Sequence, residues 1–334
     1  MSLHPAVAAV RLAVRRELAR AAGSAGRAGG SDQPRVLVAC SGGADSLALL
    51  SATVFEGHKL GWRVIGVTVD HGLQEGSGAQ AARVVEQMAA LGCDETASAR
   101  VRVEVAGEGI EAAARRARYD VLEQMRAHFG AELVLLGHTR DDQAETVLLG
   151  LTRGSGGRSL AGMRRAFDHY ARPLLDVSRD DTVTACQVEG LEIWDDPHNE
   201  DLGFTRVRVR RLVLPLLEEE LGPGVAATLA RTADQLRDDV EALDELAAGA
   251  AAVLVTADGV DLAGLRAEPR AIASRVLRAA AVDAGAIDAE LFHVHVGALL
   301  DLATGRVRGE VQLPGHLTAY VADGRLAFRR TTAG

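Results

Sequence analysis

Four short runs rich in β-branched residues alternate with helical patterns in the first half of the chain, and this alternation constrains the fold more than any other feature. The runs are RVLVAC (35–40), RVIGVTVD (63–70), VRVEVA (101–106) and ELVLLG (132–137). The helical patterns lie at about 44–58, 77–92, 109–129 and 140–152. Such alternation predicts βαβ units and an α/β fold, in which helices cover both faces of a parallel, Rossmann-like sheet. Ligands of such sheets bind beyond the carboxyl ends of the strands.

The rest of the chain predicts two smaller parts. Residues 1–33 combine an amphipathic helix over about 5–20 with a glycine-rich loop, and the sheet domain then occupies 34–217. Gly222-Pro223-Gly224 is a strong break. We expect residues 225–334 to form a smaller helical domain with the strand-rich tail GEVQLPGHLTAYVADGRLAF. A length of 334 residues fits two domains.

Composition excludes several classes of protein. Lys59 is the only lysine, and no Gly-Lys-Ser/Thr triplet is present, which argues against a Walker-type phosphate loop. The three cysteines form no C-x-x-C pair, which argues against a zinc ribbon and suits the reducing cytoplasm. No apolar run reaches the length of a membrane helix, so we expect no membrane partner. A net charge of −9 argues against a generally basic nucleic-acid coat but leaves room for local basic faces.

The first strand run leads directly into a candidate phosphate-binding loop, Ser41-Gly42-Gly43-Ala44-Asp45-Ser46. Glycines allow a ligand to approach the backbone closely, and the helix expected from Ala44 directs free N–H groups to the same point. The carboxylate of Asp45 would repel phosphate unless a divalent cation lies between them. A plain strand-to-helix turn is the alternative, but the full pattern S-G-G-x-D-S is more specific than such a turn.

Further polar residues follow the second and fourth strand runs. Asp70 and His71 end the second run, where they form either a simple turn or the border of a nucleotide pocket. After the fourth run, His138, Asp142 and Glu145 fall on one face of the expected helix. Acidic residues at this point also cap helices, but capping does not explain Glu145 and His138. The clustered carboxylates suit either Mg²⁺ or an ammonium group.

Arginines concentrate in three places within this acidic chain. Because backbone phosphates are contacted mainly by arginine and lysine, these clusters are the candidates for polyanion binding. For any single arginine, a solvated helix face paired with acids is the alternative. The candidates are Arg115 and Arg118, then Arg153, and then Arg206, Arg208 and Arg210.

Together these segments resemble the PP-loop ATP pyrophosphatases and, within them, the tRNA(Ile)-lysidine synthetases. The matching motifs are SGGADS, VDHGL, IEAAARRARY, GHTRDDQAETVL, RGSGGRSLAGM, RPLLDVSR and DPHNEDLGFTRVRVRRLVLP, which are collinear over about residues 35–216. The tail GEVQLPG is similar to the C-terminal domain of the family, which would contact tRNA. Val207 and His198 depart from the residues expected at their positions.

The resemblance implies an adenine-nucleotide hydrolase-like fold and a two-step ligase reaction. ATP and Mg²⁺ would adenylate the wobble cytidine of a tRNA(Ile) with a CAU anticodon, and free L-lysine would then attack C2 to give lysidine, AMP and pyrophosphate. The SGGADS loop, Asp70 and His71 would bind ATP, with Asp45 reaching the metal. Catalysis would fall to Asp45, His138, Asp142 and Glu145, and the arginine clusters would hold tRNA rather than DNA. A PP-loop tRNA-thiolation enzyme and a non-catalytic nucleotide- or RNA-binding module are the alternatives.

Overall fold

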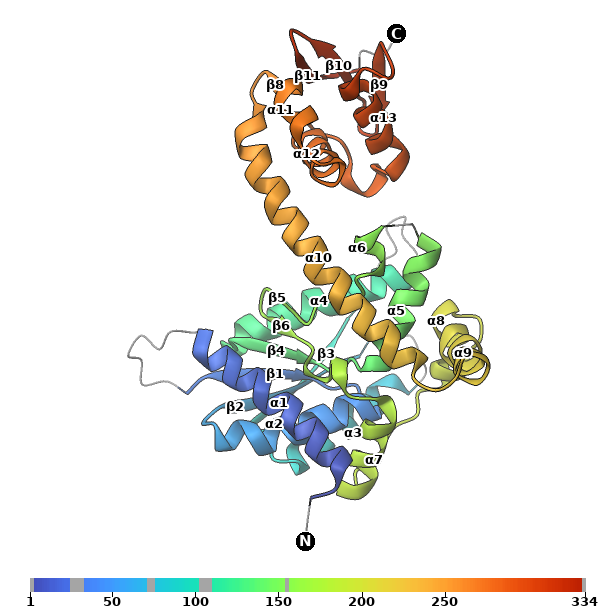
Figure 1. The fold of residues 1–334 in the computed structure, drawn as a ribbon. Helices are drawn as coiled ribbons and strands as arrows, with labels where there is room; N and C mark the ends of the chain where they lie inside the picture. The colour runs from blue at the N-terminus through green and yellow to red at the C-terminus, as the bar shows by residue number, and fades with distance from the viewer. Residues whose placement is uncertain (1–2, 25–32, 71–75, 102–109, 154–155, 332–334) are drawn as a thin grey trace. The chain divides into compact units, whose positions relative to one another are not determined.

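The structure, a computed structural model, describes residues 3–24, 33–70, 76–101, 110–153 and 156–331. The chain forms two compact units, one ending at Gln235 and the other beginning at Leu236 (Figure 1). The boundary lies within the long helix α10 (Val225–Leu254), whereas the sequence places a domain boundary between 217 and 225. Each unit has its own hydrophobic core.

A six-stranded sheet forms the centre of the first unit, as the strand–helix alternation predicts. Its strand order is β3-β2-β1-β4-β6-β5, and every pairing is parallel except that of β5 with β6. The strands are β1 (Arg35–Ala39), β2 (Arg63–Asp70), β3 (Glu95–Arg100), β4 (Leu133–Leu136), β5 (Ala166–Phe167) and β6 (Tyr170–Ala171). Because β1 and β4 are neighbours, the segments that follow them meet at the same edge.

Helices cover both faces of this sheet, and the alternation of side chains along β1 shows how. Val36 and Val38 of β1 pack into the core beneath the helices on one face, whereas Leu37 packs with Leu122 on the opposite face. The first face carries α1 (Pro5–Ser24), α2 (Ala44–Lys59), α3 (Ser77–Ala90) and α7 (Arg179–Glu189), and the second carries α4 (Ile110–Phe129). The α/β, Rossmann-like prediction is confirmed.

The third strand lies earlier in the chain than the run VRVEVA indicates. It pairs with β2 from Ile65↔Glu95 to Asp70↔Arg100, and the amide of Val101 then donates to the carbonyl of Asp70 at 2.9 Å. Residues 102–106 of the predicted run lie outside the described residues. An edge strand needs no continuous apolar run, which explains why the small and polar segment ETASAR supplies it.

Apart from β5, β6 and α7, the segment between β4 and α10 is built of further helices and helical turns. They are α5 (Arg140–Arg153), α6 (Gly157–Leu160), η1 (Pro173–Asp176), η2 (Pro197–Glu200), α8 (Thr205–Arg208), η3 (Val209–Val213) and α9 (Leu214–Leu221). The turn η3 is π-helical and precedes Pro215. Proline has no N–H and its ring clashes with the carbonyl four residues earlier, which accounts for the wide turn at this position.

The second unit contains a five-stranded antiparallel sheet of order β7-β8-β11-β10-β9. Its elements are β7 (Val255–Thr256), β8 (Gly259–Asp261), α11 (Leu262–Ala267), α12 (Arg270–Asp283), η4 (Asp288–Glu290), α13 (His293–Thr304), β9 (Glu310–Leu313), β10 (Leu317–Ala322) and β11 (Arg325–Arg330). The strand-rich tail is therefore present, with β7 and β8 added. Among the described helices, none is long and apolar enough to cross a membrane.

Candidate active site

The loop after β1 connects directly to the N-terminus of α2. Gly43 is the N-cap residue, so the free amides of the first helical turn follow immediately. Ser46, which is buried, closes the loop: its hydroxyl accepts from the Ser41 amide at 3.1 Å and donates to the Gly43 carbonyl at 2.9 Å. A closed loop at a helix N-terminus is a ready site for an anion such as phosphate.

Two glycines allow this loop to lie where it does. Gly42 has a φ of +87°, and a Cβ there would stand 2.8 Å from Cγ2 of Val84. Gly137, directly after β4, lies against the first turn of α2: its Cβ would stand 3.1 Å from the backbone of Asp45 and Ser46. The loop after β4 therefore approaches the phosphate loop at backbone distance.

A cavity of about 390 Å³ opens beside the phosphate loop, at the carboxyl ends of β1, β2 and β4. Its lining includes Ser41, Gly43, Asp70, Arg115, Arg118 and His138. Asp70 ends β2, is buried, and lies 3.6 Å from Nε of Arg100 through its Oδ2. His71 lies outside the described residues. The cavity thus brings together residues predicted from three separate strand ends.

Asp45, Asp142 and Glu145 lie beyond the lining of this cavity, in an ion-pair cluster with arginines. Nη2 of Arg179 lies 2.8 Å from Oδ1 of Asp142, and its Nε lies 3.5 Å from Oδ2 of Asp45. The Glu145 side chain has no exposed surface and accepts from Nε of Arg206 at 3.0 Å and from Nε of Arg210 at 2.7 Å. The three carboxylates that the sequence singles out are therefore close together, and each is paired.

Burial and the neighbouring arginines act in opposite directions on the pKa values of Asp45 and Asp142. Burial raises the pKa of Asp45, with a contribution from nearby Asp142, and Arg179 and Thr182 oppose the rise. Burial also acts to raise the pKa of Asp142, but Arg179, His138 and the Thr139 amide outweigh it and lower that pKa to about 2. Asp142 also accepts from the Thr139 hydroxyl, so it caps α5 as well as joining the cluster.

Comparison with known proteins places this arrangement in a family. A family model described as a PP-loop domain matches residues 12–217. A tRNA(Ile)-lysidine synthase from Streptomyces coelicolor is 50% identical over 99% of this chain and 100% of its own length. The chain belongs to the tRNA(Ile)-lysidine synthase family. Two further tRNA(Ile)-lysidine synthases are similarly close to this chain. The one from Thermobifida fusca is 50% identical over 96% of this chain and 97% of its own length. The one from Salinispora tropica is 48% identical over 97% of each chain.

A solved structure of a more distant protein has a similar fold. The U34-tRNA thiolase NcsA from Methanococcus maripaludis, with its [4Fe-4S] cluster, matches with a TM-score of 0.53 at 17% identity. The match covers 68% of this chain and 78% of the thiolase. At that identity the likeness concerns the fold alone.

Helix α7 supplies site residues that the sequence does not single out. Three side chains on one face of it contact the first turn of α2: Arg179 and the Thr182 hydroxyl donate to the Asp45 carboxylate, and Sγ of Cys186 donates to the Ala44 carbonyl at 3.4 Å. Ser178 and Asp181 form a capping box that fixes where α7 begins. The pattern S-R-D-D at 178–181 overlaps the end of the motif RPLLDVSR and signals this helix start, but it does not indicate the partner of Arg179.

The predicted tRNA-contacting arginines of this family member have different surroundings. Arg206 and Arg210, four residues apart, both turn toward Glu145. Arg208 is exposed and donates to the carbonyls of Leu202 and Gly203. Arg115 is exposed and lies with its guanidinium 5.2 Å from the Tyr119 ring centroid. The side chain of Arg153, the last residue of α5, is outside the described residues. Contact with tRNA remains a prediction for all of them.

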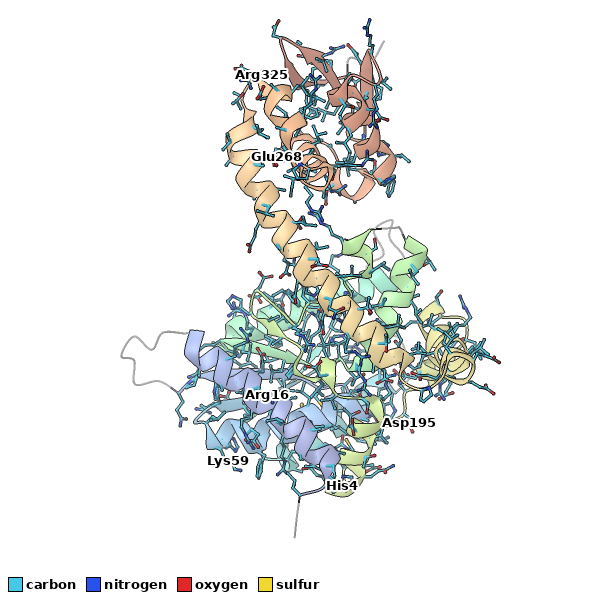
Figure 2. The ribbon with its side chains drawn as sticks, viewed as in Figure 1. His4, Arg16, Lys59, Asp195, Glu268 and Arg325 are labelled. Carbon is cyan, nitrogen blue, oxygen red and sulfur yellow. The ribbon has the colours of Figure 1, made fainter. Side chains whose placement is uncertain are left out.

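The only lysine lies away from the phosphate loop, and the three cysteines are protonated. Lys59 is exposed at the end of α2, with Nζ 3.7 Å from the Phe55 ring centroid (Figure 2). Burial raises the pKa of Cys93 and of Cys186 to about 12, and it raises the pKa of Cys40 as well. These cysteines are therefore thiols at neutral pH and weak nucleophiles.

Proposed function

We propose that this protein joins L-lysine to the wobble cytidine of a tRNA(Ile) with a CAU anticodon, with ATP as the source of energy. The proposal rests on family membership and on one geometric observation. The phosphate loop after β1 and the carboxylates after β4 lie at neighbouring strand ends, with Gly137 against the backbone of Asp45. A nucleotide held by the loop and an ammonium group held by the carboxylates would therefore meet at one point.

The first step in this proposal is adenylation. The cytidine O2 attacks the α-phosphorus of ATP, the new O–P bond forms, and pyrophosphate leaves with the electron pair of the broken bond. The loop amides of Gly42 and Gly43 and the hydroxyl of Ser41 would hold the pyrophosphate. Arg115 and Arg118 line the same cavity and would meet the phosphates of ATP or of the tRNA.

The second step is attack of an uncharged lysine amine on C2 of the adenylated cytidine. The new C–N bond forms, AMP leaves with the electron pair of the broken C–O bond, and the nitrogen loses a proton to solvent. Asp142 and Glu145 would bind an ammonium group of lysine, because their carboxylates are buried side by side among three guanidinium groups. Arg179, Arg206 and Arg210 would share these carboxylates with the substrate.

Mg²⁺ fits this site through Asp45. A Mg²⁺ ion is commonly held by one or two carboxylates together with substrate phosphates and water, so a full set of protein ligands is not required. Among the described residues no group of three His, Cys, Asp or Glu side chains is arranged to hold a metal. We assign the metal-bound triphosphate to Asp45, because this carboxylate lies in the first turn of α2, directly after the phosphate loop. The ion would neutralise phosphate charge there.

The test is transfer of labelled lysine to an isoleucine tRNA transcript carrying a CAU anticodon, with ATP and Mg²⁺ present. We expect lysine to appear in this tRNA and not in a matched transcript with a UAU anticodon. Glu145→Gln should reduce the transfer, whereas Glu56→Gln, at another buried carboxylate paired with an arginine, should not. Absence of label from the CAU transcript, in protein that binds ATP, would rule the proposal out.

A further inference from the structure

The ring of His138 has no hydrogen-bond partner among the described residues, although it stands in the middle of the site. His138 follows Gly137 directly and lines the 390 Å³ cavity. Its Nδ1 is fully buried and unpartnered among the described side chains; Nε2 is not among the buried, unpartnered atoms. The ring therefore presents Nε2, rather than Nδ1, to the cavity.

The surroundings keep this imidazole neutral. Burial lowers the pKa of His138 to about 3; Asp142 opposes the shift, whereas Arg172, Arg206 and Arg115 add to it. A neutral imidazole carries one proton, on either Nδ1 or Nε2. A buried N–H without an acceptor is rarer in proteins than a buried acceptor without a donor. The proton therefore belongs on Nε2, where a molecule in the cavity can accept its hydrogen bond.

The position of the ring indicates what that acceptor is. His138 lies on the connection between β4 and α5, with the phosphate loop on one side and the carboxylates of α5 on the other. In the function proposed above, pyrophosphate occupies the loop and lysine the carboxylates, so the α-phosphoryl group lies between them. Its non-bridging oxygens are the acceptors within reach of this connection.

We propose that His138 is a catalytic residue that donates a hydrogen bond from Nε2–H to a non-bridging oxygen of the α-phosphoryl group, without gaining or losing a proton. This role rests on the proposed function. As the cytidine O2 bonds to the α-phosphorus and pyrophosphate departs, the donated hydrogen bond stabilises charge on the equatorial oxygens. The same bond stabilises AMP when it leaves C2. A neutral donor performs both tasks without having to be reprotonated.

Three variants test the role of the proton. His138→Leu removes the donor and should lower kcat by about 10² to 10³, with little change in the KM for ATP. His138→Gln keeps an N–H donor on a side chain that cannot act as acid or base at neutral pH, and it should recover at least tenfold of that loss. His128→Gln, at an exposed histidine of α4, is the matched control and should behave as wild type. Equal losses in the Leu and Gln variants would overturn the proposal.

The protonation state can be measured without activity. Nitrogen-15 spectra of histidine-labelled protein, with the His138 signals assigned by their loss in His138→Gln, should show a protonated Nε2 and a bare Nδ1 from pH 5 to 8. A His138 that becomes doubly protonated in this range, or that carries its proton on Nδ1, would overturn the proposal. Failure of lysine transfer by the wild-type protein would instead contradict the proposed function, so the two failures are distinguishable.

Discussion

Nη2 of Arg179 lies 2.8 Å from Oδ1 of Asp142, and this ion pair joins the start of α7 to the start of α5 beside the phosphate loop. The same guanidinium reaches Asp45 and Glu145, at 3.5 and 3.3 Å. One arginine thus contacts all three carboxylates of the cluster. Arg179 contributes electrostatically as well as structurally, because its charge opposes the rise that burial causes in the pKa of Asp45.

Removal of this arginine should move the pH dependence of the reaction. Burial already raises the pKa of Asp45, and Arg179 restrains that rise, so Arg179→Gln should raise the pKa further. If Asp45 must be ionised to meet the metal, the acid limb of kcat/KM against pH will shift to higher pH. Arg165→Gln, at an arginine paired with Asp176 and Asp234, is the control. If the acid limb of Arg179→Gln is not shifted, ionisation of Asp45 does not determine that limb.

The Thr182 hydroxyl should position Asp45. Thr182 is fully buried and donates to Oδ1 of Asp45, so Thr182→Val preserves shape while removing a hydrogen bond to a charged group. Such bonds contribute about 1.5–3 kcal/mol, and we expect kcat to fall by about tenfold or more. Thr53→Val, at a fully buried threonine that donates to the Leu49 carbonyl, is the matched control. Equal steady-state kinetics of the two variants would contradict this role.

Asp142 should stabilise the fold in a defined range of pH. Its pKa is lowered from 3.8 to about 2 in the folded chain, so its stabilising contribution is complete above pH 4 and is lost as the pH falls toward 2. The difference in free energy of unfolding between wild type and Asp142→Asn should therefore shrink over that interval. Urea unfolding at stepwise pH measures it. A difference that stays constant from pH 7 to pH 3 and below would argue against an ionised, stabilising Asp142.

The contact at Gly137 should be sensitive to a single methyl group. In Gly137→Ala the new Cβ would stand 3.1 Å from the backbone of Asp45 and Ser46, which forces the phosphate loop to shift by a few tenths of an ångström. We expect weaker ATP binding, measured by calorimetry, with the fold retained. Gly297→Ala, in α13 where nothing lies within 4 Å of the new methyl group, is the control. ATP affinity equal to that of wild type would mean that the loop tolerates the shift.

Local patterns in the sequence predict most elements of the first unit well, because each of these elements has its own signal. The run RVIGVTVD coincides with β2, and the helical pattern at 44–58 falls within α2. The edge strand β3 is displaced from its apolar run because an edge position does not demand burial on both faces. The two-residue strands β5 and β6 are too short to give a periodic signal.

The sequence predicts many of the site residues but not which of them form ion pairs with one another. The i, i+4 spacing of Arg206 and Arg210 indicates a shared helix face, yet that face meets Glu145 more than sixty residues away in sequence. Arg179 is missed for the same reason: its partner Asp45 is 134 residues away. Such pairs depend on how α5, α7 and α8 pack around the sheet, and no local pattern encodes that packing.

The reaction proposed for this chain converts one cytidine of its tRNA into lysidine. The most direct measurement is the mass of the first anticodon nucleoside, isolated by nuclease digestion after the tRNA has been incubated with the protein, ATP, Mg²⁺ and L-lysine. We predict a cytidine that has gained lysine with loss of water, at that position alone, and no such product with Asp45→Ala. An unmodified cytidine, or a base that has gained sulfur, would contradict the account.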